Sequence, residues 1–164
     1  MTTIGVVADT HIPSRARSIP GEVLEALHGV SMILHAGDLT TDDVIQTLEE
    51  LAPVKAVYGN IDPDDLVSRL TGRRVIPVES ALIGLVHGHE GKGRTTADRA
   101  LRAFANERVQ CVVFGHTHAP LCEERNGILL LNPGSCTDRR TQPRRSFGFL
   151  YVDGDQVRGE IRFL

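Results

Sequence analysis

Short apolar runs alternate with amphipathic stretches through the first two thirds of the chain. The apolar runs are four to six residues long and predict buried strands at residues 3–8, 31–34, 54–58 and 111–114. Apolar residues spaced three or four apart predict helices over residues 20–28, 40–51 and 95–108. Pro20 suits a first helical turn, and Thr40 or Thr41 and Thr95 or Thr96 suit N-caps. The alternation predicts parallel strands joined by helices.

Paired strand signals dominate the rest of the chain. Residues 74–78 and 82–86 predict one strand pair, and residues 121–125 and 128–131 flank Asn126-Gly127, a sequence typical of a type I′ hairpin. Residues 146–152 and 156–163 flank Asp153-Gly154 in the same way. The pattern therefore predicts a mainly parallel half joined to a more antiparallel sheet. No linker is evident, so we expect a single domain over residues 1–164.

Polar residues of a few types follow five of the predicted strands. These strand ends are Asp9, Gly37-Asp38, Gly59-Asn60, His87-Gly88 and Gly115-His116. In open α/β sheets, sites lie outside the carboxyl ends of the strands, so the five ends are expected to converge on one edge. His116 and His118 are two residues apart after a strand, where side chains point to the same side. One loop is therefore expected to present both rings to one place.

Composition and charge narrow the class of partner. The chain has 164 residues and a net charge of −3, which gives no strong signal for nucleic acid or an anionic membrane. No apolar run approaches the about 20 residues that span a bilayer, and residues 3–8 are too short for a signal peptide. Three cysteines without metal-type spacing suit a reducing cytoplasm. We expect a cytoplasmic protein with a small-molecule substrate and no membrane partner; a monomer and a homo-oligomer both stay open.

The expected edge gathers oxygen and nitrogen ligands without a thiolate. The set comprises Asp9, His11, Asp38, Asn60, His87, His116 and His118. Seven side chains exceed the three or four protein ligands of one catalytic zinc, but they suit two ions that share a ligand. The mixed donors fit two divalent ions, with manganese as first choice and nickel, iron or zinc as alternatives. Such a pair activates water and clamps phosphoryl oxygens.

The strand-end motifs resemble, in order, the signature blocks of the calcineurin-like metallophosphoesterases. The blocks are Asp9-Thr10-His11, Gly37-Asp38, Gly59-Asn60, His87-Gly88 and Gly115-His116-Thr117-His118. The chain length and the sequences around Asp38, His89 and Asn132-Pro133-Gly134-Ser135 resemble the small single-domain YfcE-like phosphodiesterase branch, to which the retromer subunit Vps29 is related. The resemblance covers about residues 3–152. It implies an α/β fold (α+β in some schemes), a four-layer α/β/β/α sandwich of two mixed sheets flanked by helices.

The resemblance also implies roles for individual residues. One ion would be held by Asp9, His11 and His118, and the other by Asn60, His87 and His116. Asp38 would bridge the ions, and a hydroxide between them would attack phosphorus directly, without a phospho-enzyme. Asp38, Asn60 and His89 are the candidate catalytic residues. For His89, a contact to substrate phosphate and a solvent-facing position both stay open.

The sequence departs from the wider superfamily at one position. Many members have a histidine directly after the motif asparagine, thought to protonate the leaving group, but here Ile61 and then Asp62 follow Asn60. General acid catalysis typically contributes about 10²–10⁴-fold. We therefore expect a preference for good leaving groups such as aryl phosphodiesters, unless Asp62 or His89 substitutes.

Three further sequence features each allow a structural and a functional interpretation. His35 is interpreted as a structural histidine rather than a ligand, and Asn132-Pro133-Gly134-Ser135 as a turn or a lining of the site. The arginines between Asp138 and Arg145 form either a solvated loop or a phosphate-binding loop.

For the whole chain, the leading function is a metal-dependent phosphodiesterase. The alternatives are a Vps29-like protein-binding scaffold, a phosphomonoesterase or a nucleotide pyrophosphatase; a scaffold is free to lose histidines, which this chain retains.

Overall fold

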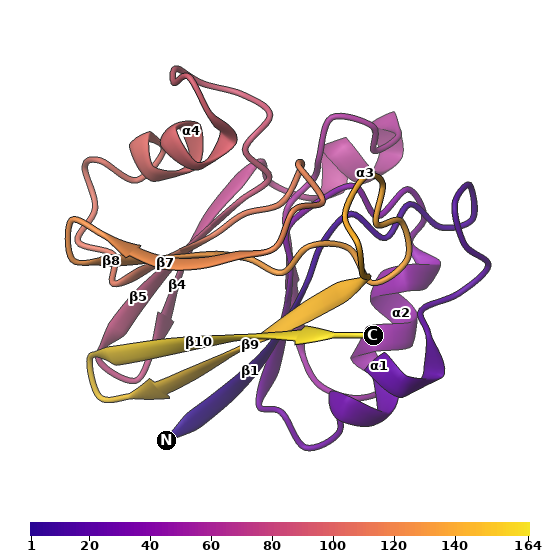
Figure 1. Ribbon diagram of the computed structural model, residues 1–164, viewed down its shortest axis with the longest axis horizontal. Coiled ribbons are helices and arrows are strands. Elements are labelled where there is room, and N and C mark those ends of the chain that lie inside the picture. The colour runs from indigo at the N-terminus through magenta and orange to yellow at the C-terminus, as the bar shows by residue number, and fades with distance from the viewer.

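Two five-stranded β-sheets pack face to face in the computed structural model, which describes residues 1–164 (Figure 1). The first sheet has the order β10-β9-β1-β2-β3. Its strands are β1 (Thr2–Val7), β2 (Met32–His35), β3 (Val54–Ala56), β9 (Ser146–Asp153) and β10 (Gln156–Phe163). Strands β1, β2 and β3 are parallel, whereas β9 is antiparallel to both β1 and β10. The first sheet is therefore mixed.

The second sheet is also mixed and has the order β4-β5-β6-β8-β7. Its strands are β4 (Arg73–Val78), β5 (Ala81–Val86), β6 (Cys111–Val113), β7 (Leu121–Arg125) and β8 (Ile128–Asn132). The three central strands β5, β6 and β8 are parallel, and each edge strand is antiparallel to its neighbour. The carboxyl ends of β5 and β6 therefore lie at one edge of this sheet.

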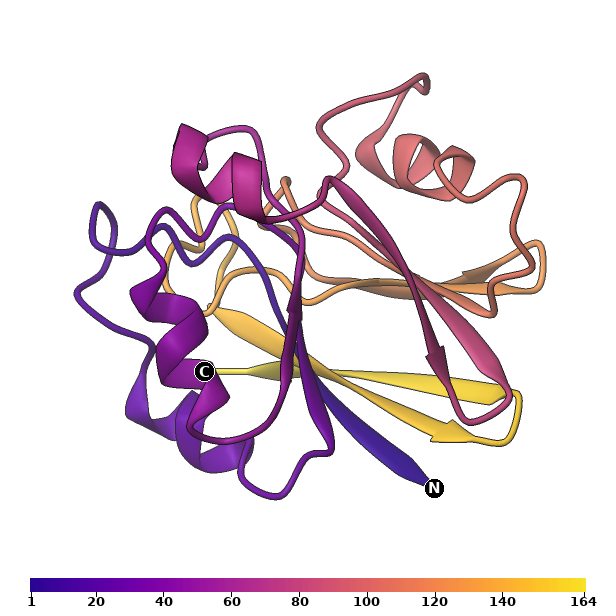
Figure 2. The same cartoon turned by 180° about the vertical axis from the view of Figure 1, so that it is seen from behind.

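Helices cover the outer faces of both sheets. They are α1 (Gly21–Ala26), α2 (Asp43–Glu49), α3 (Asp64–Arg69) and α4 (Thr96–Arg102). Figures 1 and 2 show α4 on the outer side of the second sheet and α1 and α2 beside the first sheet, on the opposite side of the molecule. None of the four helices is long and apolar enough to cross a membrane. This arrangement confirms the four-layer α/β/β/α sandwich of two mixed sheets.

Three apolar clusters correspond to the three interfaces between these layers. The cluster between the sheets includes Ile4 and Leu85, both fully buried. Leu27 belongs to the cluster under α1 and α2, and Phe104 belongs to the one under α4. Alternating strand residues thus face opposite apolar layers, which explains why the strands are apolar on both faces.

The pairing of the hairpins differs from the pattern-based expectation. The structure contains no separate antiparallel half, because β9 and β10 extend the first sheet while β7 and β8 extend the second. A hairpin motif specifies its own two strands but not the sheet edge it joins. The turn itself is as predicted: Asn126 and Gly127 have φ angles of 54° and 78°, as a type I′ turn requires.

Two helix boundaries also differ from the prediction. Helix α2 begins at Asp43 without a side-chain cap, and Thr40 has a φ of 75° and donates its N–H to Asp62 instead. Helix α4 ends at Arg102, well before residue 108. Its beginning is as predicted, because Thr95 and Asp98 form a reciprocal capping box.

Candidate metal centre

Two groups of three potential ligands lie at the carboxyl ends of the parallel strands. The first group consists of Asp9, His11 and His118, and the second consists of Asp38, His87 and His116. Within each group, one ligand atom from each residue lies within 4.8 Å of the others. Only His116 is partly exposed; the other five side chains are buried. The structure therefore contains two candidate metal-binding groups.

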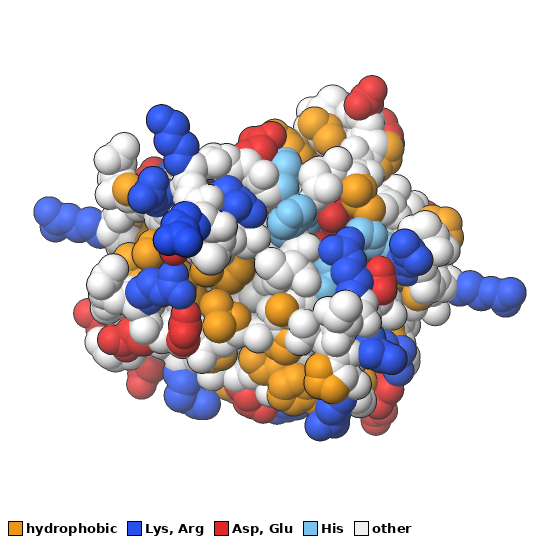
Figure 3. Space-filling model, turned by 45° about the horizontal axis from the view of Figure 1, so that its top comes forward, with side chains coloured by type: hydrophobic (Ala, Val, Ile, Leu, Met, Phe, Trp, Pro, Cys, Tyr) orange, Lys and Arg blue, Asp and Glu red, His pale blue; other side chains and the backbone are white.

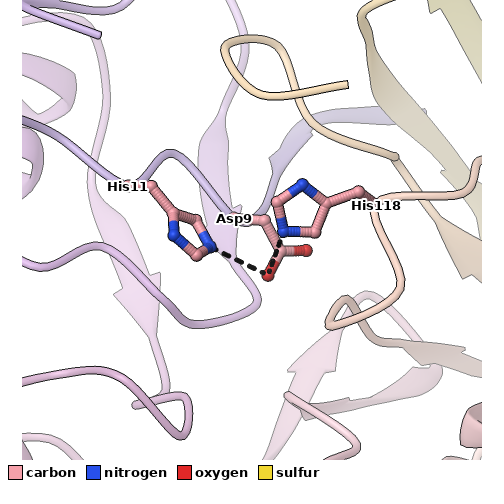
Figure 4. Close-up of side chains that lie close together, drawn as sticks. All are labelled: Asp9, His11 and His118. Atoms are coloured by element: carbon pink, nitrogen blue, oxygen red, sulfur yellow. Dashed lines mark ion pairs between the residues drawn. The ribbon is translucent and has the colours of Figure 1, made fainter. Parts of the chain in front are cut away.

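The first group has buried ligand atoms without partners. The Nε2 atoms of His11 and His118 lie 3.8 Å and 3.7 Å from Asp9 Oδ1, and Figure 4 shows both rings turning a nitrogen toward this oxygen. All three atoms are buried without a hydrogen-bond partner, which costs about 1–3 kcal/mol per atom. Two ligands that each lie 2.0–2.2 Å from one ion are roughly 3–4 Å apart. The geometry therefore fits a bound cation.

Hydrogen bonds on the far side of two rings fix which nitrogen faces the site. His87 Nδ1 donates to the backbone carbonyl of Ala36 at 2.7 Å, and His118 Nδ1 donates to the carbonyl of Asp138. In the neutral tautomer, each Nε2 then carries a lone pair. His87 Nε2 lies 3.2 Å from Asp38 Oδ2. Burial lowers the pKa of His87, but the Asp38 carboxylate outweighs burial and raises this pKa, so without a metal a proton joins these two atoms. A metal ion would take the place of that proton, and the outer hydrogen bonds orient the rings for it.

Asp38 lies between the two groups, as a bridging ligand must. Its Oδ2 is 3.4 Å from His11 Nε2 in the first group and 3.2 Å from His87 Nε2 in the second. Asn60 adjoins the second group, with its Oδ1 3.1 Å from both His87 Nε2 and His116 Nδ1. The structure thus brings together all seven side chains that the sequence singles out.

Neighbouring histidines keep the Asp38 carboxylate charged. Burial raises the pKa of Asp38, but His11 and His87 outweigh burial and hold this pKa well below its usual range. Burial lowers the pKa of His11, but the carboxylates of Asp38 and Asp9 outweigh burial and raise this pKa to about 9. For His118, burial prevails and lowers the pKa. The centre therefore holds a charged carboxylate beside imidazoles, and a divalent cation would displace the proton that the raised pKa places on His11.

Five of the seven ligands have a left-handed backbone. The φ angles are 54° at Asp9, 46° at His11, 57° at Asp38, 73° at His116 and 59° at His118. Each costs roughly 1–2 kcal/mol for a residue other than glycine. His116 and His118 both reach this centre, as expected, but the two-residue period of a strand is not the reason. Strand β6 ends at Val113, and the two left-handed residues send their rings into different groups.

Glycines allow the ligand loops to approach each other closely. A Cβ atom on Gly59 would lie 2.1 Å from Asp38 Oδ1, and one on Gly115 would lie 2.8 Å from Asp9 Oδ2. The space that these glycines leave is filled by the two carboxylates. The Gly-Asn and Gly-His pairs in the sequence thus combine a ligand with the clearance it requires.

Residues 2–155 match the calcineurin-like phosphoesterase superfamily domain. The chain belongs to this superfamily. It is 42% identical to a probable metallophosphoesterase of Methanothermobacter thermautotrophicus, over 96% of the chain and 90% of that protein. It is 26% identical to a phosphodiesterase of Methanocaldococcus jannaschii, over 81% of the chain and 83% of that protein.

A solved structure shares this superfamily fold over nearly the whole chain. The crystal structure of Vps29 from Entamoeba histolytica in complex with Zn²⁺ is 26% identical, has a TM-score of 0.79, and covers 99% of each chain. Membership of the calcineurin-like superfamily indicates a hydrolase that acts on phosphoesters with the help of bound metal.

One residue that supports the centre of this calcineurin-like phosphoesterase has a role that the sequence did not reveal. Asp62 accepts N–H groups of Asp38 at 2.9 Å, Gly59 at 2.7 Å and Thr40 at 2.7 Å. Because both of its oxygens accept from the backbone, Asp62 holds the Asp38 loop and is not free to donate a proton. The hypothesis that Asp62 acts as the missing acid therefore loses its support. The Gly-Asn-x-Asp spacing is the only sequence signal for its role.

Asn132, Ser135 and His35 stabilise the ligand loops from behind. Asn132 Nδ2 donates to the carbonyl of Gly115 at 3.0 Å, and Ser135 Oγ donates to the carbonyl of Asp9 at 2.8 Å. Both side chains are buried, so they position the loops rather than line the site. His35 is also buried; its Nδ1 accepts the N–H of Gly37 at 3.2 Å, as expected of a structural histidine.

His89 lies beside the second group. Its ring centroid is 5.3 Å from that of His87 and 6.4 Å from that of His116. Nε2 faces Glu90 Oε1 at 3.4 Å, whereas Nδ1 is buried without a hydrogen-bond partner. The solvent-facing interpretation of His89 is therefore less suitable than a place in the wall of the site.

Proposed function

We propose that the chain is a metal-dependent phosphodiesterase with two divalent ions at the edge shared by the two sheets. The observation that carries this proposal is the buried set of unpartnered atoms in the first group, beside a carboxylate that faces histidines of both groups. The similarity to a phosphodiesterase of Methanocaldococcus jannaschii supports the choice of phosphodiesters. Mixed oxygen and nitrogen ligands suit Mn²⁺, Fe, Zn²⁺ and Ni²⁺, and of these we take manganese as the first choice.

The proposed ligands divide between the two ions. One ion would be held by Asp9, His11 and His118, the other by Asn60, His87 and His116, with Asp38 shared. Bound together, the two ions would supply water of lowered pKa for direct attack on phosphorus and positive charge for the phosphoryl oxygens.

The chain itself contributes position and hydrogen bonds. Asp62 and the N–H of Ile61, which donates to Asp38 Oδ1 at 3.0 Å, hold the shared carboxylate in place. Asn60 is exposed, so its amide can also face the substrate. His89 is the proposed partner of the leaving group because it is partly exposed beside the second group.

The test is hydrolysis by metal-stripped protein after addition of Mn²⁺, Ni²⁺, Zn²⁺ or Mg²⁺. We expect faster turnover of an aryl phosphodiester than of the matching monoester. Asp38→Ala should reduce the rate below about a tenth, because the shared ligand is lost, whereas Asp65→Ala, an exposed residue of α3, serves as the matched control. No turnover with any metal would refute the enzyme proposal and favour the protein-binding scaffold. Faster turnover of the monoester would favour a phosphomonoesterase.

A further inference from the structure

Two loops beside the first group concentrate positive charge. Residues 10–20 and 136–145 contain six arginines, Arg15, Arg17, Arg139, Arg140, Arg144 and Arg145. They contain a single acidic residue, Asp138, so the net charge of the two loops is +5 on a chain whose total is −3. Figure 3 shows Lys and Arg side chains directly beside the cluster of histidines on this face. Positively charged side chains thus lie at the mouth of the proposed active site.

The loop of residues 136–145 is fixed against the first group. The carbonyl of Asp138 accepts the Nδ1 proton of His118, and Thr137 Oγ1 donates to the carbonyl of Thr10 at 2.7 Å. The carboxylate of Asp138 lies 3.6 Å from Arg15 Nε and accepts the N–H of Arg140 at 3.3 Å. One aspartate therefore joins both loops and sets the backbone of Arg140, whose φ is 49°.

Arg140, like Arg145, is an unpaired cation of this loop. No carboxylate lies within 4.0 Å of its guanidinium, whereas Arg139 donates to the carbonyl of Gln142 at 2.6 Å and Arg144 donates to that of Leu164 at 3.3 Å. Burial is the main cause of the lowered pKa of His118, and the positive charge of Arg140 adds to it. The geometric link is Asp138, which accepts from His118 Nδ1 with its carbonyl and from the N–H of Arg140 with its carboxylate, so Arg140 is held two residues beyond a contact to a proposed ligand of the first ion.

A phosphodiester without a further phosphate would already balance the charge of the metal centre, without Arg140. Two divalent ions with the carboxylates of Asp9 and Asp38 would carry a net charge of +2. One hydroxide and one phosphodiester would neutralise it. The positive charge of the two loops would then remain without an anion. A substrate with one further phosphate would supply that anion.

We propose that Arg140 binds a second phosphate group of the substrate, so that the preferred substrates are phosphodiesters that carry an additional phosphate. Guanidinium matches a phosphate with two parallel hydrogen bonds, which suits this role. The inference rests on the proposed phosphodiesterase function, because it places the scissile diester at the two ions and the second phosphate on the side of His118.

The test uses two substrates that differ only in one phosphate. The p-nitrophenyl ester of thymidine 5′-phosphate is compared with the same ester carrying a 3′-phosphate, using Mn²⁺-loaded protein. The wild type should show a kcat/KM about tenfold or more higher for the second substrate, the effect of one charge-assisted hydrogen-bond pair. Arg140→Gln should reduce this ratio to below about threefold, mainly through KM. Arg144→Gln, whose side chain covers Phe163, is the matched control and should retain the ratio.

Calorimetric binding of thymidine 3′,5′-bisphosphate and thymidine 5′-phosphate gives a readout without turnover. The bisphosphate should bind more tightly to the wild type, and Arg140→Gln should remove the difference. Hydrolysis of neither substrate would refute the proposed function, while the binding comparison still decides the role of Arg140. Equal rates on both substrates, or an equal loss on both in Arg140→Gln, would refute the second-phosphate site.

Discussion

The replacement Gly59→Ala tests whether the close approach of two loops sets the metal centre. The new Cβ would lie 2.1 Å from Asp38 Oδ1 and 2.6 Å from its backbone nitrogen. An ordinary contact begins at 3.4 Å, so the carboxylate has to move by about 1.3 Å. Metal–ligand distances tolerate only about 0.2 Å. The hydrogen bond from Ile61 N to Asp38 Oδ1 is also lost with this movement.

Metal affinity should therefore fall about 100-fold, or about 2.7 kcal/mol, since even an outer-shell change costs about 10–100-fold. Titration calorimetry of the metal-free protein with Mn²⁺ measures this loss, and circular dichroism checks that the variant is folded. Gly21→Ala is the matched control, because nothing lies within 4 Å of its added Cβ. Wild-type affinity for both ions in Gly59→Ala would show that the Asp38 position is not set by this contact.

Two further predictions concern histidines outside the proposed ligand set. Burial lowers the pKa of His35 to about 3. Between pH 3 and 6.5, His35 is therefore protonated in the unfolded chain but neutral in the folded chain, so the free energy of unfolding falls as the pH falls. From pH 7 to 5, metal-free wild type should lose roughly 2 kcal/mol more unfolding free energy in urea than His35→Asn, and parallel pH curves would contradict this. His89→Ala should retain its metal but hydrolyse an alkyl diester about 10²-fold more slowly, with a smaller loss on an aryl diester. Equal losses on both diesters would show that His89 does not assist the leaving group.

Much of the centre can be predicted from the sequence because its ligands follow strands. Parallel strands place their carboxyl ends at one edge, so Asp9, Asp38 and Asn60 after β1, β2 and β3 were expected to meet. The same rule applies to His87 and His116 after β5 and β6. The hairpin at residues 126–127 was also predictable, because positive φ angles favour Asn-Gly.

The remainder depends on contacts that no local pattern encodes. Residue spacing gives no sign that Thr40 donates to Asp62 instead of capping α2, because the two residues meet only in the folded chain. The left-handed backbone at His116 and His118 likewise reflects the hydrogen bond from His116 N to Asp9 Oδ2 at 2.9 Å, over 107 positions of sequence. A period-two argument for these residues applies only inside a strand, and β6 ends before them.

The energetic cost of the ligand residues bears on the choice between an enzyme and a protein-binding scaffold. A scaffold presents surface, and its stability gains nothing from buried acceptors that face each other. Here the left-handed backbone at Asp9, His11 and His118 costs roughly 1–2 kcal/mol per residue, and the unpartnered ligand atom of each costs about 1–3 kcal/mol more. Both costs fall on the same three residues, and a cation would offset the second by contacting those atoms directly. A bound cation accounts for this coincidence. Because the similar Vps29 of Entamoeba histolytica also holds Zn²⁺, the coincidence supports metal binding, and turnover is what separates the enzyme from the scaffold.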